Sequence, residues 1–194
     1  NGNMYKTFWN GEFYEIDVWN NQPHIDFQIG TDVLCFNDPT TQTFVVFDHG
    51  FFYDVEQLPM PKYRSGRGCI VYEDLSGNLW YYQNGEQFQL SNFSADFWDV
   101  KDDIVVWSES SYFFTYCNGE KTQIENFTPI QFKIKNDVLA YQNILGGVNA
   151  FVKGEKYELT NQLDSQFEIY GDRVLVKMFN NSFMVLENGK KYTN

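Results

Sequence analysis

The residues able to perform acid–base or metal chemistry are few, and their spacing matches no catalytic motif. The two histidines, His24 and His49, show no HExxH, paired-histidine or Cys–His spacing, so no zinc site is expected. The sequence also has no GxSxG motif, no phosphate-binding glycine loop and no dinucleotide fingerprint. We therefore predict a protein that is not an enzyme, with no catalytic residues, no metal site and no cofactor.

Carboxylates are plentiful, which makes a glycoside hydrolase the enzyme class to weigh. Asp99, Asp102 and Asp103 cluster, and so do Glu73 and Asp74. A general acid needs an apolar pocket that raises its pKa. These residues fall instead in predicted turns, where acidic side chains are ordinary turn formers. A glycoside hydrolase is therefore the third hypothesis, after a protein-binding module and a carbohydrate-binding lectin.

Two features point to binding of a partner. Lys62, Arg64 and Arg67 form a basic cluster in an acidic protein and could contact an acidic loop, or could lie in a solvated connection. An apolar pair stands at a turn that is polar elsewhere, which indicates either an interface or a tucked-in loop. The predicted partner-binding residues are Lys62, Tyr63, Arg64, Arg67, Ile144 and Leu145.

Composition favours an all-β protein. Of the 194 residues 19% are aromatic, which suits pleated sheets, and only three are alanine, the best helix former. The net charge of −12 disfavours nucleic acid and anionic membrane surfaces as partners. No apolar run approaches the ~20 residues of a membrane span. Cys35, Cys69 and Cys117 lie in apolar runs, which is typical of buried thiols.

A glycine turn recurs along the whole chain and predicts a series of β-hairpins. The turn glycines are Gly11, Gly50, Gly85, Gly119, Gly154 and Gly189, and successive glycines are 39, 35, 34, 35 and 35 residues apart. Asn-Gly between apolar runs is the strongest short-range hairpin signal. A second landmark, such as Phe132–Ile134 or Phe167–Ile169, precedes an apolar run such as 138–141 in each unit. Each unit is therefore predicted to have four strands.

The two middle strands of each predicted unit are apolar on both faces, which indicates a sheet packed between two neighbouring sheets. Four strands in a repeat of about 35 residues is the pattern of a β-propeller, with an open β array or a barrel-like closure as the alternatives. We predict one β-propeller domain over residues 1–194, with a half repeat at 1–20 and full repeats at 21–58, 59–93, 94–128, 129–163 and 164–194. The ring would have five blades with a partial sixth, or six blades if residues before Asn1 complete it, and we favour six.

The hairpins at 10–16, 84–90, 118–124 and 153–159 have an NGExYxL-type pattern that resembles the short-blade propeller proteins of flavobacteria-like Bacteroidetes. The likeness covers the whole chain at the level of the repeat and assigns no site residues. It implies export to the periplasm or the cell surface. The resemblance also implies association with larger envelope assemblies, including outer-membrane protein-secretion machinery.

We expect an accessory subunit that docks by one rim onto a larger envelope protein. The alternative is a propeller lectin that stacks sugars on tryptophans, although inter-blade packing is the commoner fate of such rings. Repeated sugar pockets would reuse the same loop residues, yet the loops at 37–39, 75–77 and 108–110 differ. The tryptophans in question are Trp9, Trp19, Trp98 and Trp107.

Overall fold

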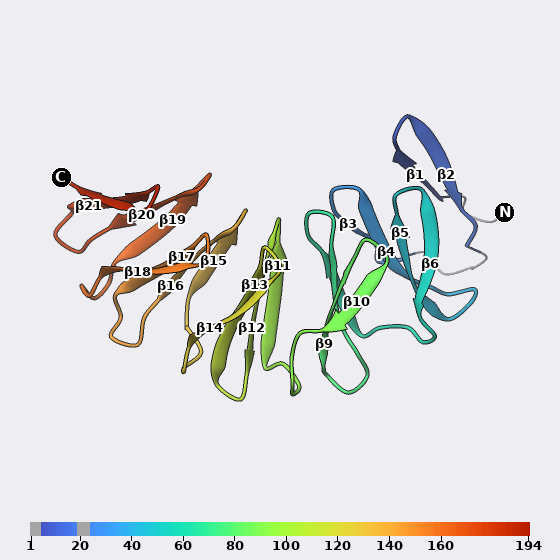
Figure 1. Ribbon diagram of the computed structural model, residues 1–194, viewed down its shortest axis with the longest axis horizontal. Coiled ribbons are helices and arrows are strands. Elements are labelled where there is room, and N and C mark those ends of the chain that lie inside the picture. The colour runs from blue at the N-terminus through green and yellow to red at the C-terminus, as the bar shows by residue number, and fades with distance from the viewer. Residues whose placement is uncertain (1–4, 19–23) are drawn as a thin grey trace. The chain divides into compact units, whose positions relative to one another are not determined.

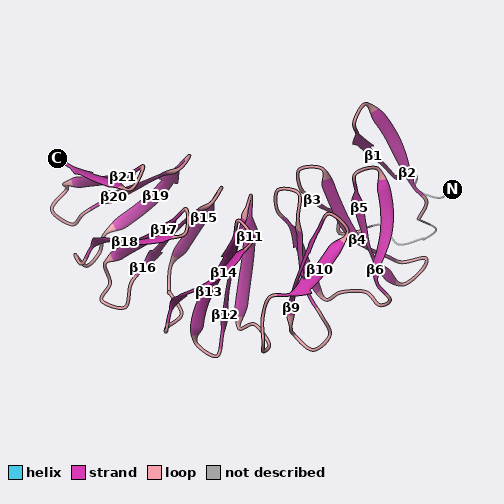
Figure 2. Cartoon of the chain, in the orientation of Figure 1, coloured by secondary structure: helices cyan, strands magenta, loops and turns pink. Residues whose placement is uncertain are grey.

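The computed structural model describes residues 5–18 and 24–194, and all of their regular secondary structure is β-strand (Figure 2). The chain divides into two compact units, residues 1–94 and 95–194. No helix in the described part of the chain is long and apolar enough to span a membrane. The predicted all-β class is confirmed.

The first unit contains a hairpin and two four-stranded antiparallel sheets, in which strands adjacent in sequence pair with each other (Figure 1). The hairpin pairs β1 (Tyr5–Trp9) with β2 (Glu12–Ile16). The two sheets are formed by β3 (Gln28–Ile29), β4 (Val33–Asp38), β5 (Thr43–Asp48) and β6 (Phe51–Glu56), and by β7 (Lys62–Ser65), β8 (Ile70–Glu73), β9 (Leu79–Gln83) and β10 (Glu86–Gln89).

The second unit contains three more four-stranded sheets of the same kind. The first has β11 (Phe97–Lys101), β12 (Ile104–Glu109), β13 (Tyr112–Cys117) and β14 (Glu120–Glu125). The second has β15 (Phe132–Lys135), β16 (Val138–Gln142), β17 (Val148–Val152) and β18 (Glu155–Thr160). The third has β19 (Gln166–Tyr170), β20 (Arg173–Lys177), β21 (Phe183–Glu187) and β22 (Lys190–Thr193). The described residues thus form five four-stranded sheets and one hairpin, as the repeat pattern predicted.

The hairpin between the last two strands has the same backbone in each repeat. Both central residues have positive φ, for example 52° at Asn84 and 80° at Gly85. Asparagine and glycine adopt this conformation readily, which is why the sequence pattern located these turns correctly. His49 and Lys153 take the asparagine position in two repeats with φ of 48° and 52°, a less favourable choice for such side chains.

The core lies between consecutive sheets. One apolar cluster packs β15–β18 against β19–β22, and another packs β11–β14 against β15–β18, so the middle sheet of the second unit is covered on both faces. In the first unit, similar clusters lie between β3–β6 and β7–β10 and between the β1–β2 hairpin and β3–β6. The strands β5 and β12 are accordingly buried along their whole length, whereas β6, β10 and β22 are largely exposed.

The three cysteines are buried thiols that form no disulfide, as predicted. Burial raises the pKa of the Cys35 thiol well above its ordinary value. Burial and, to a smaller extent, Asp137 and Asp103 raise the pKa of Cys117 to about 11. The thiols of Cys35 and Cys117 are therefore protonated at neutral pH, and all three cysteines serve as small core residues.

Candidate functional site

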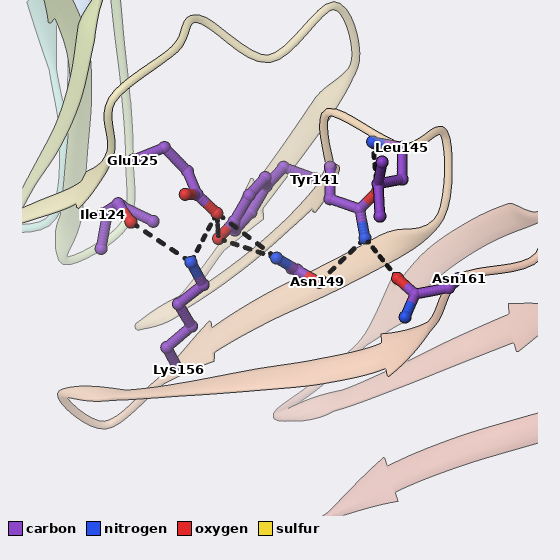
Figure 3. A network of polar contacts seen from close by, with 8 residues as sticks. Ile124, Glu125, Tyr141, Leu145, Asn149, Lys156 and Asn161 are labelled. Atoms are coloured by element: carbon purple, nitrogen blue, oxygen red, sulfur yellow. Dashed lines mark hydrogen bonds and ion pairs between the residues drawn. The ribbon is translucent and has the colours of Figure 1, made fainter.

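A buried polar network joins two consecutive sheets of the second unit (Figure 3). Glu125 is the last residue of β14, and its Oε1 accepts a 2.6 Å hydrogen bond from the Tyr141 hydroxyl on β16. Asn149 Nδ2 on β17 donates to the same oxygen at 3.3 Å, and Lys156 Nζ on β18 lies 2.6 Å from it. One carboxylate thus links three strands of the sheet that follows it.

The protonation states of this network suit a structural brace. Burial, helped by the hydrogen bond to Glu125, raises the pKa of Tyr141 far above its ordinary value. The hydroxyl therefore keeps its proton at neutral pH and donates it in the hydrogen bond to Glu125 Oε1. Because Glu125 also pairs with Lys156, its charge is compensated at a site where the side chain is 11% exposed.

The first unit contains a similar brace between its two four-stranded sheets. The Tyr72 hydroxyl on β8 lies 2.7 Å from Glu56 Oε1 and 2.8 Å from Gln87 Oε1. Glu56 is the last residue of β6, so in both units a glutamate that ends one sheet meets a tyrosine of the next sheet. Burial and Glu56 together raise the pKa of Tyr72.

The turn between β16 and β17 holds the predicted apolar pair in a fixed conformation. Asn143 Oδ1 accepts hydrogen bonds from the backbone N–H groups of Leu145 at 3.0 Å and Gly147 at 2.9 Å. Its Nδ2 donates to Asn149 Oδ1 at 3.3 Å, which connects the turn to the polar network. The side chains of Ile144 and Leu145 are left 74% and 65% exposed.

Replacing Asn143 by alanine is expected to lower the free energy of unfolding by about 1–3 kcal/mol, because two backbone N–H groups lose their acceptor. Urea denaturation followed by circular dichroism measures this loss. The matched control is Asn143→Asp, which keeps the acceptor oxygen and should retain most of the stability. Asp74 accepts from the N–H groups of Ser76 and Asn78 in the same way in the turn before β9. Equal losses of stability in Asn143→Ala and Asn143→Asp would contradict the role of the acceptor oxygen in this turn.

Exposed apolar side chains recur at the same end of other sheets. In each antiparallel four-stranded sheet the turn between the second and third strands lies at the end where the fourth strand finishes. In the second unit this end also carries Phe179, 77% exposed, and the connecting segments contribute Ile130 at 90% and Leu163 at 63%. Leu75 takes the corresponding turn position in the first unit and is 66% exposed. Sequence reasoning missed these residues, because in an apolar-rich chain each looks like one more core residue.

A groove of about 590 Å³ lies between the first strands of the last two sheets. Its walls are residues 130–133 and 165–168. Lys133 forms an ion pair with Glu168 across it and lies 5.7 Å from the centre of the Phe167 ring. The opposite charges compensate each other, so the groove presents no single sign of charge to a ligand.

The predicted basic cluster is extended in space. Lys62 and Arg64 lie on β7 and Arg67 lies in the turn that follows it, so the charges are spread along a strand that rises about 3.3 Å per residue. Arg64 and Arg67 are exposed and Lys62 is half-buried. Tyr63 belongs to the core: it is 8% exposed, and its hydroxyl donates to the Asp26 carbonyl oxygen at 2.8 Å. The side chain of Tyr63, which was predicted to bind a partner, is therefore a core residue with little exposed surface.

The basic residues lie in the first unit, and Ile144 and Leu145 lie in the second. The candidate surface of the first unit is charged, and that of the second unit is apolar. Burial of Tyr63, with smaller contributions from Asp26 and Cys35, raises its pKa to about 12, although a hydrogen bond from Asn37 opposes the shift.

Of the acidic residues weighed for hydrolysis, Asp102, Asp103 and Asp74 lie at turns, whereas Asp99 lies on β11 and Glu73 ends β8, so the prediction that all of them fall in turns is wrong for these two. Asp102 Oδ2 accepts a 2.8 Å hydrogen bond from the backbone N–H of Asn136 in the next repeat. Burial of Asp74 favours its neutral form, but hydrogen bonds from Trp80, Asn78 and the Ser76 backbone outweigh it and hold the pKa of this carboxyl below its ordinary value. A glycosidase acid requires the opposite shift.

Two of the four tryptophans considered for sugar stacking are core residues. Trp98 is 3% exposed and Trp107 is fully buried, stacked on Phe114 with ring centres 5.4 Å apart. Trp9 packs edge-on against His49 at 5.7 Å and is partly exposed. Trp19 lies outside the described residues.

Comparisons with known proteins support the fold. The sequence model described as "10-bladed beta propeller domain" matches residues 1–192. A search of the curated proteins gave no significant match. Among solved structures, human WBSCR16 is similar with a TM-score of 0.50 and 9% identity, over 93% of this chain and 68% of that one.

Two further structures match with lower TM-scores. Hsv2 of Kluyvelomyces marxianus has a TM-score of 0.45 and 10% identity over 87% of this chain, and the computationally designed Ika8 protein has 0.46 and 12% over 92%. The chain spans 63% of the length of Hsv2 and 64% of that of Ika8. At such identities the likeness concerns the fold alone.

Proposed function

The chain belongs to the 10-bladed beta propeller domain family, and we propose that it is a non-catalytic protein-interaction module whose residues 1–194 act as one propeller domain. The observation that carries the proposal is the exposed pair Ile144–Leu145 on a turn held in place by Asn143. Exposed aliphatic side chains on a rigid turn suit protein contact, because their burial is favourable and the turn loses little freedom on binding.

The proposed role is that of an exported accessory subunit, in the periplasm or at the cell surface, docked on a larger envelope complex. Outer-membrane protein-secretion machinery is the candidate assembly. The support is the repeat-level resemblance to short-blade propellers of flavobacteria-like Bacteroidetes. The six glycine hairpins against five full repeats support a ring of six blades, one of them incomplete in this chain. Arg64 and Arg67 would form a second, electrostatic contact with an acidic partner segment.

Affinity purification of the tagged full-length protein from its own cell envelope, followed by mass spectrometry, tests the docking role. A stoichiometric envelope protein is expected. The double variant Ile144→Ser/Leu145→Ser should recover about tenfold less of it. The matched control is Phe51→Ser, which removes an equally exposed apolar side chain from the first unit. Recovery of the tagged protein alone would contradict the proposal.

The charged surface is tested in the same experiment by Arg64→Glu/Arg67→Glu. Reversal of these two charges should weaken capture of the envelope partner mainly at low ionic strength, since salt screens exposed charges. Lys101→Glu/Lys135→Glu reverses two exposed cations of the second unit and is the control with the same change in net charge. Loss of capture that is independent of salt would argue against an electrostatic contact.

A carbohydrate-binding propeller is the second candidate. The support for it is the set of exposed aromatic rings on β6, where Phe51, Phe52 and Tyr53 are 65%, 40% and 43% exposed. Burial of Trp98 and Trp107 weighs against it, because a ring must be accessible to stack on a sugar. Several multivalent hits on a glycan array, reduced by Phe51→Ser, would reverse the order of the two proposals.

A further inference from the structure

The fourth strand of the first four-stranded sheet, β6, is an edge strand that pairs with β5 alone among the described strands (Figure 1). The β1–β2 hairpin packs against one face of this sheet, and β7–β10 packs against the other. Both faces are therefore covered within the described chain, and the exposure of this edge does not depend on where the sequence begins or ends. We call the free side of Phe51–Glu56 the β6 edge.

The β6 edge lacks the features that protect the corresponding strands of the other sheets. Natural sheets discourage pairing along an exposed edge with lysine side chains or with short strands. The fourth strands β14, β18 and β22 each carry at least one lysine, and β10 has only four residues, three of them polar. In contrast, β6 has six residues, no lysine and three aromatic side chains at its start. They are Phe51, Phe52 and Tyr53, which are 65%, 40% and 43% exposed.

The backbone of β6 offers two residues to an added strand. The two-residue turn before it closes on Asp48 and Phe51, whose backbone groups bond to each other across the hairpin. In an antiparallel pair such residues alternate with residues whose N–H and C=O groups point away from the partner strand. The N–H and C=O groups of Phe52 and Asp54 are therefore directed outward from the sheet.

The side chains of β6 specify the chemistry of a strand beside it. On the face toward β7–β10 they are Phe51 and Tyr53, with ring centres 6.4 Å apart. On the opposite face they are Phe52, whose ring centre lies 4.9 Å from that of Phe47, and Asp54. Opposed side chains on neighbouring strands attract each other when both are apolar or when their charges are opposite. A matching strand would therefore place aliphatic residues beside Phe51 and Tyr53, and lysine or arginine beside Asp54.

Charge favours a basic partner over a second copy of this chain. Residues 1–58 contain nine carboxylates and one lysine, a net charge of −8. Pairing between the β6 edges of two copies would bring two such negative surfaces together, and like charges on neighbouring strands are destabilising. A basic segment would instead be attracted to the same surface.

We propose that the β6 edge binds an extended segment of a partner protein as a fifth strand, in which aliphatic and basic side chains alternate. The proposal rests on the proposed role as a protein-interaction module, and it adds a further contact whose affinity comes mainly from backbone hydrogen bonds. Every second residue of the segment exchanges hydrogen bonds with Phe52 or Asp54. Because directly opposed residues share a face of the sheet, these bonded residues are the basic ones.

Binding of a synthetic strand to the purified full-length protein tests the proposal. The probe is a fluorescein-labelled peptide in which valine and lysine alternate, and fluorescence anisotropy at physiological ionic strength follows its binding. Saturable binding is expected. N-methylation of the lysine backbone nitrogens should raise the dissociation constant at least about tenfold, because it keeps the charge but removes the N–H groups that face Phe52 and Asp54. The matched control is N-methylation of the valine backbone nitrogens, which face away and should leave binding unchanged.

Substitutions in β6 test the same hydrogen bond from the protein side. Phe52→Pro removes the outward N–H at a position where an edge strand tolerates proline, and it should raise the dissociation constant about tenfold. Phe52→Ala loses the same ring but keeps the N–H, so its effect should stay below about threefold. Thermal denaturation checks that both variants are folded. Asp54→Asn should weaken binding about threefold, whereas Glu86→Gln, with the same change in net charge on β10, should not.

Equal weakening by the two patterns of N-methylation would overturn the proposal, because the aromatic rings or the net charge would then hold the peptide. Failure of the unmodified peptide to bind would overturn it as well. Self-association of the protein without peptide, abolished by Phe52→Pro, would identify a second copy as the occupant of the edge instead. Capture of an envelope protein through Ile144 and Leu145 is a separate readout that Phe52→Pro should not change, so failure of one role can be told from failure of the other.

Discussion

Raising the pH above 10 is expected to destabilise the protein steeply, because several buried tyrosines keep their protons only in the folded chain. Burial raises the pKa of Tyr72, Tyr82 and Tyr141 far above the ordinary value of 10.0, and neighbouring carboxylates add to the shift. Tyr63 is raised to about 12. The unfolded chain loses these protons near pH 10 while the folded chain retains them. Stability is therefore complete below pH 10 and falls as the pH rises toward the folded pKa values.

Each tyrosine that ionises only on unfolding contributes a slope of about 1.4 kcal/mol per pH unit, so several together can exceed the whole stability within about two units. Urea denaturation at successive pH values measures the slope, and phenolate absorbance reports the ionisation. Tyr141→Phe is the matched variant, and its slope should be shallower by one tyrosine. Titration of all 13 tyrosines near pH 10 without unfolding would show that the buried hydroxyls are not protected.

Replacing Phe113 by alanine is expected to lower the free energy of unfolding by about 3–5 kcal/mol. The ring is fully buried and lies 6.0 Å from Phe97, 6.1 Å from Phe132 and 5.9 Å from Tyr141, measured between ring centres. It therefore fills the core between β11–β14 and β15–β18, and its removal leaves a cavity that these rigid rings close only in part.

Chemical denaturation measures this loss, with Phe179→Ala as the matched control. Phe179 is 77% exposed, so its truncation should change stability by less than about 0.5 kcal/mol. The slope of the free energy of unfolding against denaturant concentration should remain unchanged in both variants. Similar losses at the two positions would show that the aromatic cluster is not the centre of the unit.

The repeat was predictable because its signals are local. A hairpin depends on two residues that accept positive φ, such as Asn118 and Gly119, and those residues are adjacent in sequence. Burial on both faces also leaves a local trace, the unbroken apolar runs that became β5 and β12. Four strands per repeat and buried cysteines followed from these patterns.

The candidate site was harder to predict, because its contacts join distant residues. Glu125 and Tyr141 are 16 residues apart on different sheets, and neither has a distinctive neighbour in sequence. Tyr63 stands among basic residues, yet the alternation of β7 turns it into the core while Arg64 faces solvent. The pair Ile144–Leu145 was found because it interrupts a polar turn, whereas the exposed side chain of Phe179 resembles the buried phenylalanines around it.

The hydrogen bond between Tyr141 and Glu125 limits how the number of repeated sheets in such a chain can change. Its counterpart, Tyr72 with Glu56, lies 69 residues earlier, and Asp74 and Gly77 precede Asn143 and Gly146 by the same interval. One repeat after Glu56 and Tyr72 the matching positions in the sequence hold Ser91 and Trp107, so neither the carboxylate nor the phenol hydroxyl is present there. These side chains therefore repeat every 69 residues, an interval of two sheets. Loss or duplication of a single sheet would place a glutamate opposite a residue other than tyrosine, or a tyrosine opposite a residue other than glutamate. Loss or duplication of two consecutive sheets would preserve each glutamate–tyrosine pair.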